Sequence, residues 1–268
     1  MREGPPLDDR AFTIDAFHRG RFHLVQPAGK GHRAGLDAML LAGAVQAGFA
    51  GALADLGAGA GAAGFAVAAR CPEARVLLVE REPEMVACAQ ESLRLPANSA
   101  LASRIEVLQA DVELSGSDRA KAGLAENAFD FIIMNPPFNA AHDRASPDPL
   151  RRQAHVMDDG LFERWLRTAA AMARPGARVA VIARPASLAQ ILSALEGRFG
   201  SPRAVPVHPR PGVEALRIIL RARKGDRGGF ALLPPLVLHG ETGRGFTACA
   251  DAIIRSEEHT SELQSPDH

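Results

Sequence analysis

The chain has 268 residues, of which 47% are hydrophobic, and its 31 basic and 31 acidic side chains give a formal net charge of zero. This length and apolar content suit one sizeable α/β domain. The balanced charge excludes a basic coat for nucleic acid along the whole chain, and it also excludes an acidic, disordered tail.

Several features of the sequence bear on where the protein works. No stretch approaches the roughly 18 apolar residues that a membrane span requires, and Met1 to Arg10 lack the apolar region of a secretory signal. The cysteines Cys71, Cys88 and Cys249 are odd in number and far apart, so they suit neither a disulfide framework nor a zinc site. We therefore expect a cytoplasmic protein without a membrane or metal partner.

The N-terminal part predicts a short hairpin over Phe12 to Gln26 that turns at Arg19-Gly20, and then a buried, alanine-rich helix over Leu36 to Ala47. From Ala52 onward, apolar strands alternate with helical patterns. The expected elements are, in chain order, a strand at 52–57, a helix at 61–70, a strand at 75–80, a helix at 83–93, strands at 104–109 and 129–134, a helix at 158–173, a strand at 178–183 and a helix at 188–196.

The last two predicted strands, Arg203 to Val207 and Ala215 to Arg221, have no helical pattern between them. Alternation of strands and helices predicts a doubly wound, mostly parallel sheet. The final pair breaks the alternation and should therefore add an antiparallel strand at the edge. We expect a seven-stranded α/β fold.

The C-terminus has an unusual composition. Residues Arg255 to Ser265 read R-S-E-E-H-T-S-E-L-Q-S, which resembles the in-frame translation of a widely used sequencing adapter. We therefore expect residues 255–268 to be an assembly scar, and we exclude them from the reasoning about the fold.

A glycine-rich loop follows the first strand of the predicted sheet. Asp55 is followed by Gly57, Gly59 and Gly61, and the loop opens a helix. Glycines allow the backbone to approach a ligand closely, and the start of the helix favours polar or charged groups. Because the loop lies at the carboxyl end of a strand, it predicts a ligand site there.

Two acidic residues end the next two strands. Glu80 can accept hydrogen bonds from both hydroxyls of a ribose, and Asp111 can accept one from the exocyclic amine of an adenine. These features do not settle the ligand, because Gly59 to Gly64 also satisfies the dinucleotide fingerprint with Glu80 near the expected ribose-binding position.

The tetrapeptide Asn135-Pro136-Pro137-Phe138 follows the apolar strand FDFIIM. The amine of a purine is a poor nucleophile because its lone pair is delocalised into the ring. Two acceptors, the Asn135 side-chain oxygen and the Pro136 carbonyl, would draw the amine toward a tetrahedral geometry. Pro137 stiffens the loop, and Phe138 offers a stacking face for a flipped base. The motif therefore predicts chemistry on an amino group, without a metal.

Over about Ala52 to Arg223 the chain resembles the class I S-adenosylmethionine-dependent methyltransferases that act on amino groups, which have a Rossmann-like fold. It is most similar to the bacterial tRNA adenine-N6 methyltransferase group, which acts on the anticodon loop of a valine tRNA. The N-terminal residues that carry this closer resemblance are Gly20-Arg21, Gln26-Pro27 and the run Gly31-His32-Arg33-Ala34-Gly35-Leu36-Asp37-Ala38.

The resemblance implies a role for each candidate residue. The methionine part of S-adenosylmethionine would lie against Asp55, Gly57, Gly59 and Gly61, its ribose at Glu80 and its adenine near Asp111, while Arg33 and Asp37 would belong to a segment that lids the cofactor. Asn135, Pro136, Pro137 and Phe138 would hold the target base. Residues 1–50 would then form the lidding extension, 51–230 the methyltransferase domain and 231–254 a C-terminal segment.

Two stretches predict contacts with RNA. Arg144, Arg151 and Arg152 follow the proposed target loop and could hold phosphates around a flipped base. A solvated loop whose arginines reflect genomic composition is the alternative. The second stretch, Arg198 to Arg227, carries eight bases and two acids and predicts a positive face. We expect a monomer with tRNA as its partner.

Other functions remain open at this point. Methylation of a guanine in rRNA or of a protein glutamine would use the same motifs. A nicotinamide-dependent oxidoreductase would explain the glycines but not Asn135 to Phe138, and the chain has no tyrosine for a Tyr-x-x-x-Lys pair. A binding module that has lost activity is a further alternative, but it would not explain why the glycine loop and the motif from Asn135 to Phe138 are intact.

Overall fold

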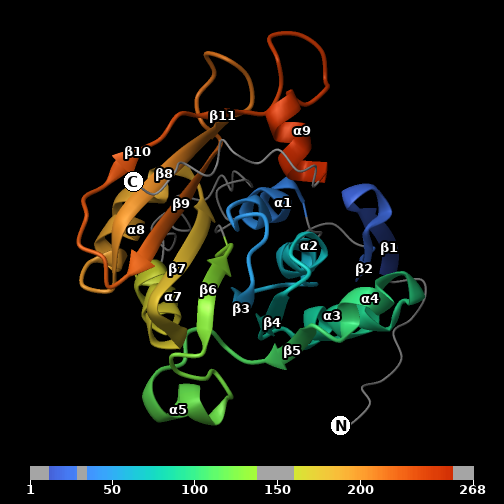
Figure 1. The fold of residues 1–268 in the computed structure, drawn as a ribbon, viewed down its shortest axis with the longest axis vertical. Helices are drawn as coiled ribbons and strands as arrows, with labels where there is room; N and C mark the ends of the chain where they lie inside the picture. The colour runs from blue at the N-terminus through green and yellow to red at the C-terminus, as the bar shows by residue number, and fades with distance from the viewer. Residues whose placement is uncertain (1–11, 29–34, 138–159, 256–268) are drawn as a thin grey trace, which may run out of the picture.

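The computed structural model describes residues 12–28, 35–137 and 160–255 (Figure 1). The elements of the first half are β1 (Phe12–Phe17), η1 (His18–Gly20), β2 (Phe22–Pro27), α1 (Leu36–Gly43), β3 (Gly51–Leu56), α2 (Ala62–Arg70), β4 (Ala74–Glu80), α3 (Pro83–Arg94), η2 (Pro96–Asn98), α4 (Ser99–Ala102), β5 (Ile105–Gln109), α5 (Gly116–Lys121) and β6 (Phe129–Met134).

The second half continues the alternation and then departs from it. Its elements are α7 (Leu161–Met172), β7 (Ala173–Ala183), η4 (Pro185–Ser187), α8 (Leu188–Leu195), β8 (Phe199–His208), β9 (Arg217–Lys224), β10 (Ala231–Leu232), β11 (Leu236–Val237) and α9 (Ala248–Arg255). The helix α9 includes Arg255, the first residue of the stretch that resembles an adapter, and residues 256–268 lie outside the described part of the chain.

The main sheet has the order β10-β8-β9-β7-β6-β3-β4-β5, and β11 also pairs with β8 (Figure 1). The strands β5, β4, β3, β6 and β7 are parallel to one another. The strand β9 is antiparallel to both β7 and β8. The α/β class, the mostly parallel sheet and the antiparallel pair at its edge are therefore confirmed. All seven expected strands are present, and β9 lies between β7 and β8.

Two short strands extend the sheet beyond the seven that the sequence predicts. Both β10 and β11 have two residues and pair with β8 in a parallel direction. Pro234 and Pro235 separate them, and a proline cannot donate the N–H that a continuous strand would need. The prolines therefore divide the outer strand into two pieces.

The sheet is buried on both faces. In β6, Phe131 and Ile133 belong to one apolar cluster, which includes residues of α1, α2 and α9, while Ile132 and Met134 belong to another, which includes residues of α7 and α8. A parallel strand covered by helices on both sides reads as a continuous apolar run, which explains the sequence FDFIIM.

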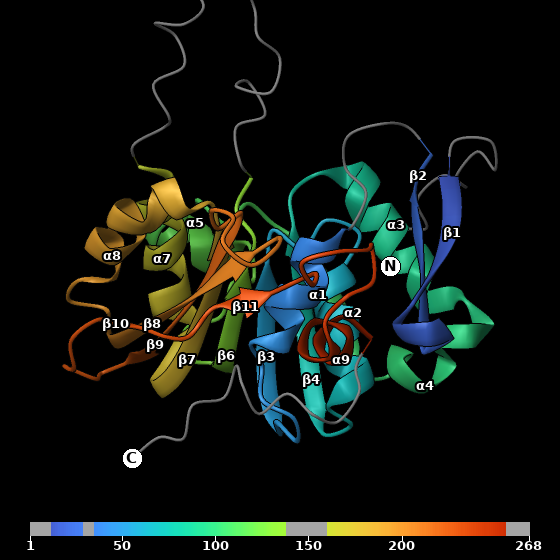
Figure 2. The same ribbon diagram turned by 90° about the horizontal axis from the view of Figure 1, so that it is seen from above.

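The N-terminal hairpin lies beside α3 in both views of the ribbon (Figures 1 and 2). It turns at Arg19 and Gly20, both with positive φ, as the sequence predicts. The Val25 N–H donates to Ser92 Oγ at 2.8 Å, and the His23 N–H donates to Asn98 Oδ1 at 2.9 Å. These bonds fix the hairpin to the helical side of the domain.

Some boundaries differ from the predictions. The helix expected to reach Ala47 ends at Gly43, and the helix expected to include Ala173 ends at Met172, because β7 begins five residues before Arg178. In β7, Ala173 pairs with Phe129 before the register shifts, so pairing with a neighbouring strand decides this boundary. The elements α4, α5 and α9 were not predicted from the sequence.

Candidate active site at the carboxyl ends of the strands

A cavity of about 1080 Å³ opens at the carboxyl ends of β3, β4, β5 and β6. Open α/β sheets bind ligands at this edge. The predicted site residues that line it are Asp37, Asp55, Gly57, Gly59, Glu80, Asp111, Asn135, Pro136 and Pro137. Gly61 is not among the lining residues. Arg33 and Phe138 lie outside the described residues.

The glycine loop is held in a conformation that side chains would block. The values of φ are +69° at Gly57, +56° at Gly59 and +95° at Gly61, in the region that favours glycine. A Cβ at Gly61 would lie 2.7 Å from Leu78 Cδ1, whereas a Cβ at Gly59 would meet no atom within 4 Å. Gly61 is therefore required for packing, and Gly59 leaves open space on the cavity side.

The carboxylate of Asp55 lies below the loop and is 2% exposed. Its Oδ2 accepts a hydrogen bond from the Gly64 N–H at 2.9 Å, in the first turn of α2. Burial raises the pKa of Asp55 to about 7; the charge of Glu80 acts in the same direction, while the bond from Gly64 opposes the shift. Asp55 therefore ties the end of β3 to the start of α2.

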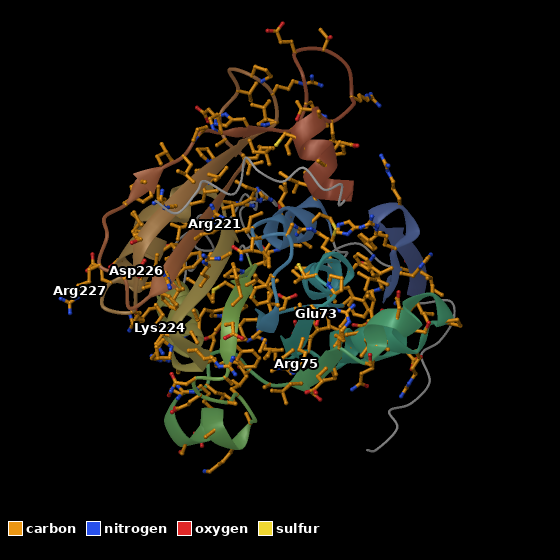
Figure 3. All side chains as sticks on the ribbon, in the orientation of Figure 1. Glu73, Arg75, Arg221, Lys224, Asp226 and Arg227 are labelled. Atoms are coloured by element: carbon orange, nitrogen blue, oxygen red, sulfur yellow. The ribbon has the colours of Figure 1, made fainter. Side chains whose placement is uncertain are left out.

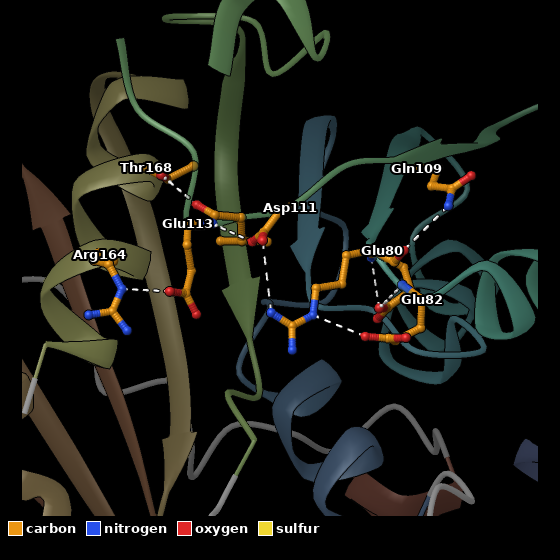
Figure 4. Close-up of polar contacts among 9 residues, drawn as sticks. Glu80, Glu82, Gln109, Asp111, Glu113, Arg164 and Thr168 are labelled. Atoms are coloured by element: carbon orange, nitrogen blue, oxygen red, sulfur yellow. Dashed lines mark hydrogen bonds and ion pairs between the residues drawn. The ribbon is translucent and has the colours of Figure 1, made fainter. Parts of the chain in front are cut away.

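Glu80, at the end of β4 (Figure 4), is 8% exposed, and its carboxylate accepts three backbone hydrogen bonds. Its Oε2 accepts from the Gly59 N–H at 2.8 Å, and its Oε1 accepts from the N–H groups of Arg81 at 2.7 Å and Glu82 at 2.9 Å. A carboxylate has about four lone-pair sites, so Glu80 keeps capacity for a ligand. The carboxylate fixes the loop and lines the cavity at the same time.

Asp111 and Glu113 follow β5 and form a second acidic edge of the cavity (Figure 4). Asp111 Oδ1 accepts from the Glu113 N–H at 2.8 Å, and its Oδ2 lies 3.8 Å from Arg81 Nη1. Arg164 Nε on α7 donates to Glu113 Oε2 at 2.5 Å. Ion pairs to Arg81 and Arg164 therefore hold these two acids.

The segment after β6 presents Asn135, Pro136 and Pro137 to the cavity. The side-chain oxygen of Asn135 is buried and accepts no hydrogen bond from the part of the chain that the structure describes. Proline has no N–H to offer as a partner, and it stiffens the segment. An unpaired acceptor that lines a cavity is available to a donor on a ligand.

Asp37, in the first turn of α1, is paired with a residue that the sequence did not indicate. Arg217 Nε, at the start of β9, donates to Asp37 Oδ2 at 2.9 Å, and both residues line the cavity. The two residues are 180 positions apart. No periodicity in the sequence could connect them, because their proximity depends on the position of β9 in the sheet.

Trp165, the only tryptophan of the chain, is a second residue that sequence reasoning missed. It lies on α7, is 6% exposed and lines the cavity. A Cβ at Gly57 would lie 2.4 Å from Trp165 Cη2, so the bare glycine accommodates the indole ring. Burial of a tryptophan on an apolar helix face is ordinary core packing, so no sequence pattern distinguishes this position.

The bases of the segment from Arg198 to Arg227 have different surroundings, although Arg203, Arg217 and Arg221 share one face of the sheet. Arg217 lies at the cavity edge, while Arg221, Lys224 and Arg227 lie along β9 and the turn after it, away from the cavity (Figure 3). Several of these bases are bound within the domain: Arg198 pairs with Glu163, Arg210 donates to the carbonyls of Gly240 and Gly243, and Lys224 donates to those of Ala170 and Ala173. Arg144, Arg151 and Arg152 lie outside the described residues.

Among residues 12–28, 35–137 and 160–255, no three His, Cys, Asp or Glu side chains gather in a way that could hold a metal ion. Within the same ranges, none of the helices has the length and apolar character needed to span a membrane.

The family model for the methyltransferase small domain matches residues 33–205. The chain belongs to this family. The match covers the loop after β3, the acids after β4 and β5 and the Asn135 segment. It ends within β8, so most of the cavity lining lies in the matched region, while Arg217 and Leu238 lie beyond it.

Relatives support the same assignment. A Porphyromonas gingivalis protein named tRNA1(Val) (adenine(37)-N6)-methyltransferase is 30% identical over 238 residues, which cover 85% of this chain and 89% of that protein. A crystal structure of a predicted O-methyltransferase from Agrobacterium tumefaciens is 41% identical, has a TM-score of 0.72, and the match covers 83% of this chain and 96% of that one.

A more distant structure shares the fold alone. It is an rRNA guanine-N2 methyltransferase from Thermus thermophilus in complex with AdoMet and guanosine, with 23% identity and a TM-score of 0.55; the match covers 83% of this chain and 53% of that chain.

Proposed function

We propose that the chain transfers a methyl group from S-adenosylmethionine to the exocyclic N6 amine of an adenine in the anticodon loop of a tRNA. The observation that carries the proposal is that Asn135, which lines the same cavity as the glycine loop, has a side-chain oxygen with no partner among the described residues. Membership of the methyltransferase small-domain family and the name of the Porphyromonas relatives support it. A tRNA substrate would make this a cytoplasmic enzyme.

The residues of the cavity fit S-adenosylmethionine. Gly59 leaves the backbone of the loop open to a ligand, and Glu80 retains acceptor capacity that suits ribose hydroxyls. Asp111 has an oxygen whose partner, Arg81, lies at 3.8 Å, so it suits the amine of an adenine. When bound, the cofactor supplies an electrophilic methyl group on a sulfonium.

The chain's own part in the reaction is to position the amine and to stabilise the charge that develops on it. Asn135 Oδ1 and the Pro136 carbonyl would accept hydrogen bonds from the two amine hydrogens, which favours the tetrahedral geometry of the attacking nitrogen. The transfer would form the new N–C bond as the S–C bond of the cofactor breaks, with S-adenosylhomocysteine as the leaving group, and the methylated amine would then release one proton to water. Holding the amine in line with the methyl group provides most of the acceleration.

Mass spectrometry of nucleosides tests the substrate. The purified chain is incubated with S-adenosylmethionine and an unmodified tRNA(Val) transcript, and a transcript with guanosine at the target position is the control. We expect N6-methyladenosine from the first RNA alone. A methylated guanosine, a ribose 2′-O-methyl group or methylation of protein would overturn the assignment.

Calorimetry with S-adenosylhomocysteine tests the cofactor. Glu80→Ala should weaken binding by about 1–3 kcal/mol, the value of a hydrogen bond to a charged acceptor. Glu106→Gln on the exposed face of β5 is the matched control and should bind normally. Tight binding of NADH by a protein that ignores S-adenosylhomocysteine would instead support an oxidoreductase.

A further inference from the structure

Two residues that line the same cavity carry polar atoms of opposite character for which the described residues supply no partner. Asn135 Oδ1 is an acceptor and Trp165 Nε1 is a donor; both are buried, and neither has a hydrogen-bond partner among the described residues. The other buried side-chain atoms in this condition are His23 Nδ1, Arg119 Nε and Arg167 Nε, on residues that do not line the cavity. The lining of the cavity therefore includes a donor and an acceptor that no described residue pairs.

The sheet brings these two residues to the same side of the cavity. Leu56 of β3 pairs with Met134 of β6, so Gly57 and Asn135 leave the sheet side by side. The six-membered ring of Trp165 covers Gly57, with Cη2 and Cζ3 within 3 Å of where a Cβ would lie. The indole of α7 thus lies over the point where β3 and β6 end.

Energetics argue that the indole N–H has a ligand. A buried donor without a partner costs about 1–3 kcal/mol, and such groups are rare in folded proteins. A phenylalanine would cover Gly57 equally well without this cost. A ligand in the cavity that Trp165 lines can supply the acceptor that this N–H lacks among the described residues.

We propose that Trp165 is a substrate-contact residue whose Nε1–H donates to the ring nitrogen beside the target amine, while Asn135 Oδ1 accepts from the amine. The inference rests on the proposed function and deepens it. The amine of adenine has an acceptor nitrogen on either side, N1 and N7. The amine of guanine has the acceptor N3 on one side but the N1–H donor on the other. A fixed donor next to a fixed acceptor therefore matches adenine in either orientation and guanine in only one.

Atomic substitution in the RNA provides the test. Anticodon stem-loop RNAs carry adenosine, 1-deazaadenosine or 7-deazaadenosine at the target position, and each is assayed with wild type and Trp165→Phe, which keeps an aromatic ring over Gly57. On adenosine, Trp165→Phe should lower kcat/KM about 5–10-fold, the range of one hydrogen bond. With wild type, kcat/KM should fall by a similar factor on one of the two deaza RNAs. With Trp165→Phe, kcat/KM on that deaza RNA should be no lower than on the adenosine RNA.

The controls separate contact from packing. Phe162→Leu removes a buried aromatic from the same helix without touching the cavity lining, so it should change stability but not the response to the deaza RNAs. Calorimetry should give both variants the wild-type affinity for S-adenosylhomocysteine. The inference is wrong if both deaza RNAs lower the kcat/KM of Trp165→Phe by the same factor as they lower that of wild type. It is also wrong if Trp165→Phe loses affinity for S-adenosylhomocysteine.

Wild type alone also tests the inference, so the result does not depend on the folding of a variant. Equal kcat/KM on all three RNAs would show that no donor contacts N1 or N7. Failure of wild type to form N6-methyladenosine on the adenosine RNA would overturn the proposed function as well, and this outcome differs from a normal reaction with no response to the deaza substitutions.

Discussion

The two halves of the cavity differ in whether the described residues supply hydrogen-bond partners for their buried polar groups. On the side of β3 and β4, the carboxylates of Asp55 and Glu80 are bound by the chain's own N–H groups, those of Gly64, Gly59, Arg81 and Glu82. On the side of β6 and α7, Asn135 Oδ1 and Trp165 Nε1 are buried and have no partner in the described residues.

This difference indicates how each half meets its ligand. The glycine loop is preorganised, because its backbone is fixed before anything binds, and preorganisation reduces the entropy that binding must overcome. The other half gains its hydrogen bonds only when a ligand with matching groups arrives. Substitutions in the first half should therefore affect folding and cofactor affinity, and those in the second should affect turnover.

The largest effect should come from Asn135→Ala. We expect kcat to fall by about 10²–10³, as for other single preorganised polar groups that act in a transition state, with unchanged affinity for S-adenosylhomocysteine. Asn135→Asp keeps an acceptor oxygen and should retain more turnover than Asn135→Ala. Near-normal turnover of Asn135→Ala on tRNA would mean that the amine is held by other residues.

Two glycine variants separate folding from binding in the loop half. A Cβ at Gly64 would lie 2.3 Å from Leu78 Cδ2 and 3.0 Å from Val76 Cγ1, so Gly64→Ala should lower the free energy of unfolding by about 1–3 kcal/mol through overpacking. At Gly59 the space is open, but its φ is +56°. Gly59→Ala should cost about 1–2 kcal/mol for the left-handed backbone and should lower cofactor affinity more than Gly64→Ala does.

Urea unfolding with and without S-adenosylhomocysteine measures both quantities for the two glycine variants. If Gly64→Ala and Gly59→Ala lose unfolding free energy and affinity for S-adenosylhomocysteine in the same proportion, folding and binding are not separated in this loop.

Asp55 should make stability depend on pH. Its pKa is raised from 3.8 to about 7, mainly by burial, so between about pH 4 and 7 the folded chain holds a proton that the unfolded chain has lost. The free energy of unfolding therefore falls as pH rises through this window, by at most about 1.4 kcal/mol per pH unit for one proton. Asp55→Asn keeps an oxygen for the Gly64 N–H and should remove this slope.

The comparison with Asp55→Asn is necessary because His18 acts in the opposite sense. Burial lowers the pKa of His18 to about 4, with Arg70 and Arg21 adding to the shift. His18 therefore contributes stability that is lost as pH falls below about 6.5. Urea titrations of both proteins from pH 5 to pH 8 isolate the Asp55 contribution, and parallel profiles would contradict it.

The smallest effect concerns the ion pair between Asp37 and Arg217. Their side chains are 25% and 27% exposed, so a double-mutant cycle of Asp37→Asn and Arg217→Gln should give a coupling energy of about 0.5–1 kcal/mol, above the value for an open surface pair. Glu91 and Arg94 on α3, which are more exposed, form the control pair. Equal coupling energies in the two cycles would show that partial burial at the cavity wall does not strengthen the ion pair between Asp37 and Arg217.

The sequence predicted the parts of the molecule that depend on local pattern. The order of strands and helices follows from apolar runs and glycines, and the loop at Asp55 and the segment at Asn135 were located because each follows a predicted strand. Arg217 and Trp165 were missed, because their place in the cavity depends on contacts across the sheet. The pairing of Asp37 with Arg217 also changes the expectation for Asp37, since its carboxylate already has a charged partner.

The position of β9 has a consequence for the growing chain. Strands β7 and β8 are synthesised before the strand that separates them, and β8 pairs with β9, β10 and β11, all of which follow it in the chain. Until residues 217–224 leave the ribosome, β7 has a free edge and β8 has no partner in the main sheet. Unpaired edges are the sites at which chains associate wrongly. A chain that stops short of Arg217 would keep these edges open and would also lack one wall of the cavity.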